Sequence, residues 1–366
     1  MKIHAVITAL ENFANTCLQE SYDNCGLLTG SSQWECTGIL CTLDCIEKIV
    51  EEAINKKCNL IVAHHPIIFL GLKKLSTNHY VERTIIKAIK NDIAIYAIHT
   101  NLDNIKHGVN KIIADKLGLI NQQILLPKRD MLMKLFVFVP IHYAEKLKNG
   151  IFNVGGGHIG NYSECSFSSP GTGTFKAGEG TEPYVGKIGE RHYENELKVE
   201  VIFPAWLQND IVKAMKQAHP YEEVAYDLVA LENKYQDVGS GIVGELPEPK
   251  DEIQFLAEIK AAFELQAIKH TALTGKKVEK VAVCGGSGSF LINKAKAAEA
   301  DFYITSDIKY HEFFEADGDL VVADIGHWES EQFVPDLLLA FLQAKFPTFA
   351  VLKSEVNTNP VGYFLA

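Results

Sequence analysis

The sequence predicts an α/β protein in which two chain segments form one α/β domain, interrupted by a smaller α+β domain. Strand-like and helix-like stretches alternate over the first 127 residues, alternate again from about residue 233, and follow a different pattern between these segments. Such alternation is typical of a parallel sheet with helices packed on its faces. The predicted divisions are a first half over 1–127, an insert over 128–232 and a second half over 233–366.

The first segment contains short apolar runs separated by helical patterns. Continuous apolar runs of this length are typical of parallel strands that are buried on both faces. The predicted strands are 38–43, 59–63 and 93–98, and the predicted helices are 46–57 and 81–90. An amphipathic first helix is also expected, from apolar residues that recur at helical spacing. These residues are Ile7, Leu10, Phe13, Ala14 and Leu18.

The last segment repeats the alternation of the first. Its predicted strands are 281–284, 301–305, 320–323 and 349–352, and its predicted helices are 252–265 and 331–345. The two segments therefore resemble halves of one α/β unit.

The insert has its own order of elements. Strands are predicted at 134–139, 197–203 and 224–230, weak strands at 162–167 and 173–177, and helices at 144–152 and 205–217. The order β-α-β-β-α-β is the ferredoxin-like arrangement. A stretch of about 100 residues is a common size for an independent domain.

Composition excludes several classes of protein. The chain has 366 residues, 47% of them hydrophobic, and a formal net charge of −11. The apolar content argues against a disordered chain, because it is enough to bury sizeable cores. The negative charge argues against nucleic acid and anionic membranes as partners, since both attract clustered lysine and arginine.

The sequence also predicts a cytoplasmic location. No apolar run approaches the ~20 residues that span a bilayer, and the N-terminal stretch shows no cleavage site for a leader. The eight cysteines form no Cys-x-x-Cys pattern. Cys36, Cys41 and Cys45 leave a thiolate zinc site open, but their spacing is irregular, and buried free thiols in a reducing compartment are the preferred interpretation.

Imidazoles and carboxylates follow three predicted strands directly. His64 and His65 follow the strand at 59–63, Asp103 comes shortly after the strand at 93–98, and His327 and Glu331 follow the strand at 320–323. Ligand sites of open α/β sheets lie at the carboxyl ends of the strands. We therefore expect these five side chains to share one edge of the sheet.

These residue types point to a metal site. Imidazole nitrogen and carboxylate oxygen together suit zinc, iron or manganese. His327 and Glu331 are four residues apart and share one face of a helix, whereas adjacent His64 and His65 diverge in an extended backbone. Two divalent ions would use that divergence, with Asp103 and Glu331 as bridges at the ~3.5–4 Å separation of two-metal hydrolases. The alternatives are a histidine pair satisfied in a loop or core, and an i,i+4 pair that only supports its helix.

Three further residues are candidates for catalysis or positioning. Asp307 and His311 follow the strand at 301–305 and would serve as substrate contacts or proton-transfer groups, unless Asp307 merely caps a helix. His99 either orients a metal ligand or is a buried histidine at a strand end.

Two other motifs allow two interpretations each. The glycine-rich run 284–289 lies between a strand and a helix, where it would bind an anion or make a closely packed turn. The run 219–223, His-Pro-Tyr-Glu-Glu, is either a second ligand site or the end of a helix before Pro220.

Five motifs together resemble one family. They are Ser21–Leu28 (SYDNCGLL), Ala63–Pro66 (AHHP), His99–Asp103 (HTNLD), Thr305–His311 (TSDIKYH) and Gly326–Glu331 (GHWESE). They resemble the NGG-interacting-factor-like (Nif-three-like) proteins with a dinuclear metal centre, often labelled GTP cyclohydrolase I type 2 homologues. The insert resembles the CutA-like and PII-like insert of longer members, chiefly through His219–Glu223. Cys25 departs from the small apolar residue expected at its position.

The resemblance carries implications that composition and spacing do not. It implies two divalent metal ions per chain on His64, His65, Asp103, His327 and Glu331, and a toroidal homohexamer capped by the inserts. It also implies a hydrolase for a nucleotide or similar small molecule, in which metal-bound hydroxide attacks the guanine ring of GTP and formate is released. The alternative is a non-catalytic metal-binding ring, a regulator or scaffold whose insert senses a metabolite.

Overall fold

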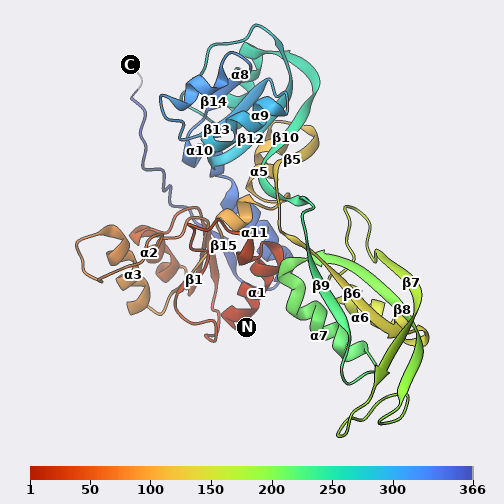
Figure 1. Ribbon diagram of the computed structural model, residues 1–366. Coiled ribbons are helices and arrows are strands. Elements are labelled where there is room, and N and C mark those ends of the chain that lie inside the picture. The colour runs from red at the N-terminus through yellow and green to blue at the C-terminus, as the bar shows by residue number, and fades with distance from the viewer. Residues whose placement is uncertain (365–366) are drawn as a thin grey trace. The chain divides into compact units, whose positions relative to one another are not determined.

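The computed structural model describes residues 1–364 (Figure 1). By their internal contacts these residues divide into two compact units. One unit combines Met1–Leu126 with the chain from Val238 onward, and the other is Pro127–Asp237. The first unit contains two sheets and the second contains one. None of the helices within residues 1–364 has the length and apolar character needed to cross a bilayer.

The first sheet has the strand order β1-β4-β3-β2-β15. The strands are β1 (Gly26–Thr29), β2 (Ile39–Thr42), β3 (Leu60–Ala63), β4 (Ala94–Ala97) and β15 (Val351–Lys353). β15, β2, β3 and β4 are parallel, and β1 is antiparallel to β4. Every residue of β2, β3 and β4 is buried, which explains their continuous apolar sequences.

Helices cover this sheet. α2 and α3 bury residues such as Ile49 and Ile85 against Ile61, and α11 (Val334–Lys345) packs on β2 and β15. α1 packs on α11, where the rings of Phe13 and Phe341 stack with centroids 4.3 Å apart. The helical segments of the N-terminal part of this unit are α1 (Ile3–Phe13), η1 (Thr16–Leu18), α2 (Glu47–Asn55), α3 (Tyr80–Lys90), α4 (Thr100–Asp103) and α5 (Val109–Lys116).

The second sheet has the strand order β11-β14-β13-β12-β10-β5. Its strands are β5 (Ile120–Lys128), β10 (Tyr235–Asp251), β11 (Lys269–His270), β12 (Lys277–Ser287), β13 (Phe302–Ser306) and β14 (Val321–Asp324). β12, β13 and β14 are parallel, and β10 and β11 are antiparallel to their partners. The helical segments of this half are α8 (Glu252–Ala262), η4 (Ser289–Leu291), α9 (Ile292–Ala297), η5 (Glu312–Ala316), α10 (His327–Glu331) and α11 (Val334–Lys345).

Two details differ from the expectation. The N- and C-terminal segments form one compact unit, but their strands lie in two sheets rather than along one, because strands pair mainly with neighbours in the same chain segment. The helix expected over 331–345 is divided into α10 and α11. Pro335 accounts for the division, because it lacks an N–H to donate to the preceding turn and favours the first turn of a new helix.

The inserted unit has the predicted element order β-α-β-β-α-β, with strand order β7-β8-β6-β9. Its elements are β6 (Leu132–Pro140), η2 (Ile141–Tyr143), α6 (Ala144–Asn153), β7 (Ser166–Lys176), β8 (Arg191–Pro204), η3 (Ala205–Leu207), α7 (Gln208–Ala218) and β9 (Tyr226–Leu231). One strand, β7, replaces the two weak strands that were expected. Leu147 and Met215 from the helices pack against Val137 and Val199, so alternate side chains of these strands point away from the helices.

The packing of α8 on the second sheet generates a test of stability. Phe255 is fully buried, with its ring edge-on to Phe302 at a centroid distance of 5.2 Å, whereas Ile253 on the same helix is 66% exposed. Phe255→Ala should lower the free energy of unfolding by about 3–5 kcal/mol, because it leaves a cavity in the core. Ile253→Ala should change it by less than about 0.5 kcal/mol in the same urea titration. Similar effects of the two substitutions would contradict this packing.

Candidate metal centre

The five predicted ligand residues lie together where the two sheets of the first unit approach each other. His64 and His65 directly follow β3, and Asp103 ends α4, the helix after β4. His327 and Glu331 are the first and last residues of α10, which follows β14 of the second sheet. The site therefore uses the carboxyl ends of parallel strands, as expected, but takes them from two sheets.

The Glu331 carboxylate lies at the centre of the cluster. Its Oε2 is 3.0 Å from His65 Nε2 and 3.1 Å from His327 Nε2. Its Oε1 points toward His64, 3.9 Å from Nε2, and that Nε2 is 3.5 Å from Asp103 Oδ1. The two carboxylate oxygens thus face two different groups of nitrogen and oxygen atoms.

Three sets of side chains have the composition and spacing to hold a metal ion. In each set the candidate ligand atoms lie within 4.8 Å of one another. The sets are His65, His327 and Glu331; His64, Asp103 and Glu331; and His64, His65 and His99. Glu331 belongs to two of them, as a bridging carboxylate would.

Two buried atoms in the cluster have no hydrogen-bond partner. They are His64 Nε2 and Asp103 Oδ1. Buried polar atoms of proteins are nearly always hydrogen-bonded, so an orphaned pair of electron donors requires an explanation. A bound cation would satisfy both atoms, and the residues present therefore fit a metal ion.

The other nitrogen of each imidazole is already engaged. In every case Nδ1–H can donate to an oxygen, which leaves Nε2 free to coordinate, and such partners commonly orient metal-binding histidines. The pairs are His65 with Asp44 (2.8 Å), His327 with Asp307 (2.6 Å), His99 with Asp23 (2.8 Å) and His64 with the carbonyl of Ile98 (2.8 Å).

Neighbouring carboxylates raise the pKa of two of these histidines, so that both imidazoles are protonated near neutral pH. Burial disfavours the cation of His65, yet Asp44 and Glu331 raise its pKa to about 9. Burial is likewise outweighed at His327, where Glu331 and Asp307 raise the pKa to about 11. Without a metal ion, protonated imidazoles therefore balance the buried carboxylate.

The two acidic ligands differ in their environment. Burial raises the pKa of Asp103 to about 7, although the charge of His99 opposes this shift. Glu331 is equally buried, but His327, His64 and His65 hold its pKa well below the usual value. Glu331 is therefore the permanent negative charge of the cluster.

The candidate catalytic residues have different outcomes. Asp307 does not cap a helix: its φ is +55° and its carboxylate accepts from His327. His99 joins the cluster through His64 and His65, and its partner Asp23 explains its orientation. His311 is exposed, and its ring contacts Tyr310 and Phe314 rather than the cluster.

Sequence reasoning missed two of the orienting carboxylates. Asp44 follows the strand β2, so the strand-end argument that found the histidines would also have selected it. Asp23 lies in an irregular segment before β1 and carries no comparable pattern. Its second oxygen accepts from the backbone N–H of Thr100, which ties this segment to α4.

The glycine-rich run is closely packed, but its residues 284–287 belong to the end of β12 and not to a turn. The amides of Gly285 and Gly286 donate to Asn110 Oδ1 (2.9 Å) and Ser330 Oγ (3.0 Å), so neither is available to an anion. A Cβ atom on Gly286 would lie 2.4 Å from Glu331 Oε1, and the φ of this residue is +62°. Glycine is needed here to leave room for the carboxylate.

The two alternative metal sites have no support. Both ring nitrogens of His219 are engaged, Nε2 with the Phe138 carbonyl and Nδ1 with the Tyr221 amide, and α7 ends at Ala218 as the helix-end interpretation predicts. No cysteine within residues 1–364 belongs to a cluster able to hold a metal, and all eight are free thiols.

Two cavities adjoin the cluster. One, of about 440 Å³, is lined by His65, Asp307 and His327, together with Lys269. The other, of about 190 Å³, is lined by His99, Asp103 and Glu331 among others. The larger lies within the ~300–1,000 Å³ range of small-molecule sites.

Fold and site define an α/β protein with a histidine–carboxylate cluster between two sheets and a separate inserted unit. The chain belongs to the family described as Duf34/NIF3 (NGG1p interacting factor 3), whose model matches residues 1–360. This confirms the resemblance inferred from the five motifs.

Individual relatives extend over the whole chain. A protein of Halalkalibacterium halodurans named GTP cyclohydrolase 1 type 2 homolog is 40% identical over 364 residues, 98% of each chain. One of the same name from Bacillus subtilis is 37% identical over 363 residues, 98% of this chain and 97% of the relative. The crystal structure of a Bacillus cereus protein related to NIF3 has a TM-score of 0.88 at 39% identity and covers 100% of this chain and 99% of its own. The likeness of the insert to PII and CutA proteins stays a prediction.

The protonated histidines predict how metal binding depends on pH. Coordination through Nε2 requires neutral imidazole, so His65 and His327 must each release a proton when a metal binds. Between pH 6 and 8, below the pKa values of about 9 and 11, zinc affinity should rise by about tenfold or more per pH unit. Chelator-buffered zinc titrations measure this slope. Asp307→Asn should make it shallower, and an affinity independent of pH would contradict the assignment.

The close approach of Gly286 predicts a steric effect. Gly286→Ala should displace the Glu331 carboxylate and lower the metal content of the purified protein several-fold, because the added methyl group overlaps Oε1. Gly118→Ala is the matched control: φ is +68°, but nothing lies within 4 Å of the added atom. Equal metal loss in both variants would show that backbone strain, and not contact with Glu331, is responsible.

Proposed function

We propose that this protein is a dinuclear-metal-dependent hydrolase that acts on a nucleotide or similar small molecule, with GTP as the specific candidate. The observation that carries the proposal is the position of Glu331, whose two oxygens face separate sets of candidate ligands. The orphaned atoms of His64 and Asp103 support it. The relatives named GTP cyclohydrolase 1 type 2 homolog support the choice of GTP.

The proposed assignment gives each metal ion its own ligands. His65 and His327 would hold one ion, His64 and Asp103 the other, and Glu331 would bridge them. Divalent zinc, iron or manganese bound in this way supplies Lewis acidity and lowers the pKa of coordinated water. His99 is an additional ligand candidate beside His64 and His65.

The chain's own residues prepare this site. Asp44, Asp307 and Asp23 accept from the Nδ1–H groups and so keep the imidazoles in the tautomer that presents Nε2. Asp103, like His65 and His327, would release a proton when it binds a metal ion, because burial raises its pKa to about 7 in the metal-free cluster. The 440 Å³ cavity beside His65 and His327 would receive the substrate.

Assembly and regulation remain part of the proposal. The toroidal homohexamer capped by the inserts stays a prediction from the family resemblance. A non-catalytic metal-binding ring, with an insert that senses a metabolite, is the alternative. Turnover separates the two functions, because a regulator would bind metal and small molecules without forming a product.

The test combines metal content with turnover. Protein purified without added metal or chelator should contain about two transition-metal equivalents per chain by elemental mass spectrometry. Glu331→Gln should reduce this content strongly. Glu329→Gln should reduce it little, because Glu329 is similarly buried on the same short helix but bonds to Asn359 Nδ2 (3.0 Å) and belongs to none of the three sets.

Turnover is then measured with a nucleotide panel that includes GTP, with formate as the diagnostic product of ring opening. Activity should fall together with metal content in Glu331→Gln and should change little in Glu329→Gln. Metal-loaded protein that converts no nucleotide would favour the regulatory alternative. If metal is absent even after reconstitution with zinc, iron and manganese, the hydrolase proposal loses its mechanism.

A further inference from the structure

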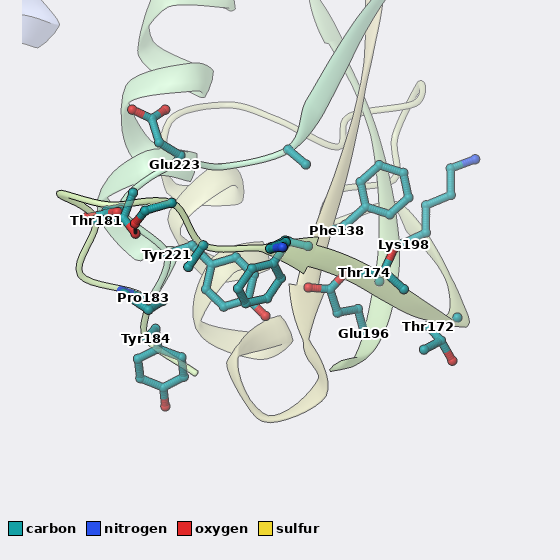
Figure 2. Close-up of a pocket in the computed structure, with 18 of the residues that line it drawn as sticks. Phe138, Thr172, Thr174, Thr181, Pro183, Tyr184, Glu196, Lys198, Tyr221 and Glu223 are labelled. Carbon is teal, nitrogen blue, oxygen red and sulfur yellow. Dashed lines mark hydrogen bonds between the residues drawn. The ribbon is translucent and has the colours of Figure 1, made fainter. Parts of the chain in front are cut away.

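A second candidate ligand site lies within the inserted unit, which contains none of the residues of the metal cluster. It is a cavity of about 630 Å³ on the side of the sheet that faces away from α6 and α7 (Figure 2). Its walls come from the glycine-rich strand β7, from Phe138 of β6, from Glu196 and Lys198 of β8, and from the segments around Tyr184 and Tyr221.

The Glu196 side chain is a buried acid in this cavity. Only 7% of the residue is exposed, and its carboxylate points toward the aromatic rings in the middle of the cavity (Figure 2). The carboxylate lies against Gly173, where a Cβ atom would be 2.1 Å from Oε2. Glycine on β7 therefore creates the space that the acid occupies.

No basic side chain neutralises this acid. Within residues 1–364 no lysine, arginine or histidine is in ion-pair contact with Glu196. The nearby Lys198 points away from it (Figure 2), with Nζ 3.1 Å from Glu200 and 4.4 Å from the centroid of the Phe136 ring. Glu222 and Glu223 on the wall add negative charge, which the positive charge of Lys176 on the same wall only partly offsets. A buried carboxylate without a cationic partner is costly, so a complementary cation would be bound favourably.

A second polar group, the Tyr221 hydroxyl, lies beside this carboxylate. It is buried and interacts with Glu196. Burial and the neighbouring Glu196 raise its pKa above the ordinary value. Its oxygen and the carboxylate are both acceptors for a ligand that carries several N–H donors.

Aromatic rings surround these acceptors. The Tyr221 ring lies 6.0 Å from that of Phe175 and 6.2 Å from that of Tyr184, between centroids, and Phe138 lines the same cavity. The faces of such rings attract cations, and their carbon atoms bury an apolar stem. The Tyr184 hydroxyl lies 3.2 Å from that of Tyr143, which helps to hold Tyr184 at the cavity wall.

We infer that this cavity binds a small organic cation, a primary ammonium or guanidinium group on an apolar stem. The cationic group would donate N–H bonds to Glu196 and Tyr221, and the stem would lie among the rings of Phe138, Phe175 and Tyr184. A metal ion is a poorer occupant, because none of the clusters within residues 1–364 that could hold one lies here. An anion is disfavoured by the buried carboxylate.

The test compares a cation with its neutral counterpart. n-Butylammonium and n-butylguanidinium are titrated against the full chain and observed by saturation-transfer-difference NMR, with n-butanol as the uncharged probe. At least one cation should bind saturably, and n-butanol should bind at least about tenfold more weakly, because it lacks the charge that pairs with Glu196.

Two variants locate the site. Glu196→Gln should weaken binding of the cation by at least about tenfold, whereas Glu232→Gln, at an exposed acid on the same unit, should leave it unchanged. Gly173→Ala keeps the charge but pushes the carboxylate from its position, and it should also weaken binding. Far-UV circular dichroism checks that each variant is folded.

Three outcomes would overturn the inference. They are saturable binding of neither cation, equal binding of n-butanol, and cation binding that folded Glu196→Gln and Gly173→Ala both retain.

Discussion

The structure depends on one buried carboxylate that is shared by two sheets. Glu331 is the last residue of α10, the helix that follows β14 of the second sheet. One of its oxygens contacts His65 and the other points toward His64, and both histidines follow β3 of the first sheet. Two other residues allow the carboxylate to occupy this position. Gly286 leaves room for the carboxylate, and Pro335 ends α10 directly after it, so that the side chain is presented at the helix terminus.

Electrostatic balance explains why the cluster is stable and also ready to bind metal. A buried anion needs compensation, and protonated His65 and His327 supply it without a metal ion. Asp44 and Asp307 accept hydrogen bonds from the Nδ1–H groups of those imidazoles. The Nε2 atoms therefore keep their positions whether they carry a proton or face a metal ion. Exchange of these protons for metal ions would therefore require little rearrangement, which is the advantage of a preorganised site.

The insert uses a related principle with a different result. Glu196, like Glu331, is a buried carboxylate given space by a glycine on a neighbouring strand. Glu331 is surrounded by imidazoles and suits metal ions, whereas Glu196 is surrounded by aromatic rings and has no basic partner, which suits an organic cation. The neighbours of a buried acid, rather than the acid itself, determine its ligand.

The sequence by itself determined the strands β2, β3, β4, β13 and β14, because their continuous apolar runs are unambiguous. It also selected the five candidate ligand residues, because each comes directly or shortly after β3, β4 or β14. It did not determine that β15 joins the first sheet, or that the ligands come from two sheets. The orienting role of Asp23 and the pocket around Glu196 were also decided only by the tertiary structure. The physical reason is that periodicity and strand-end position are local properties, whereas an ion pair or a cavity requires residues far apart in the chain to meet.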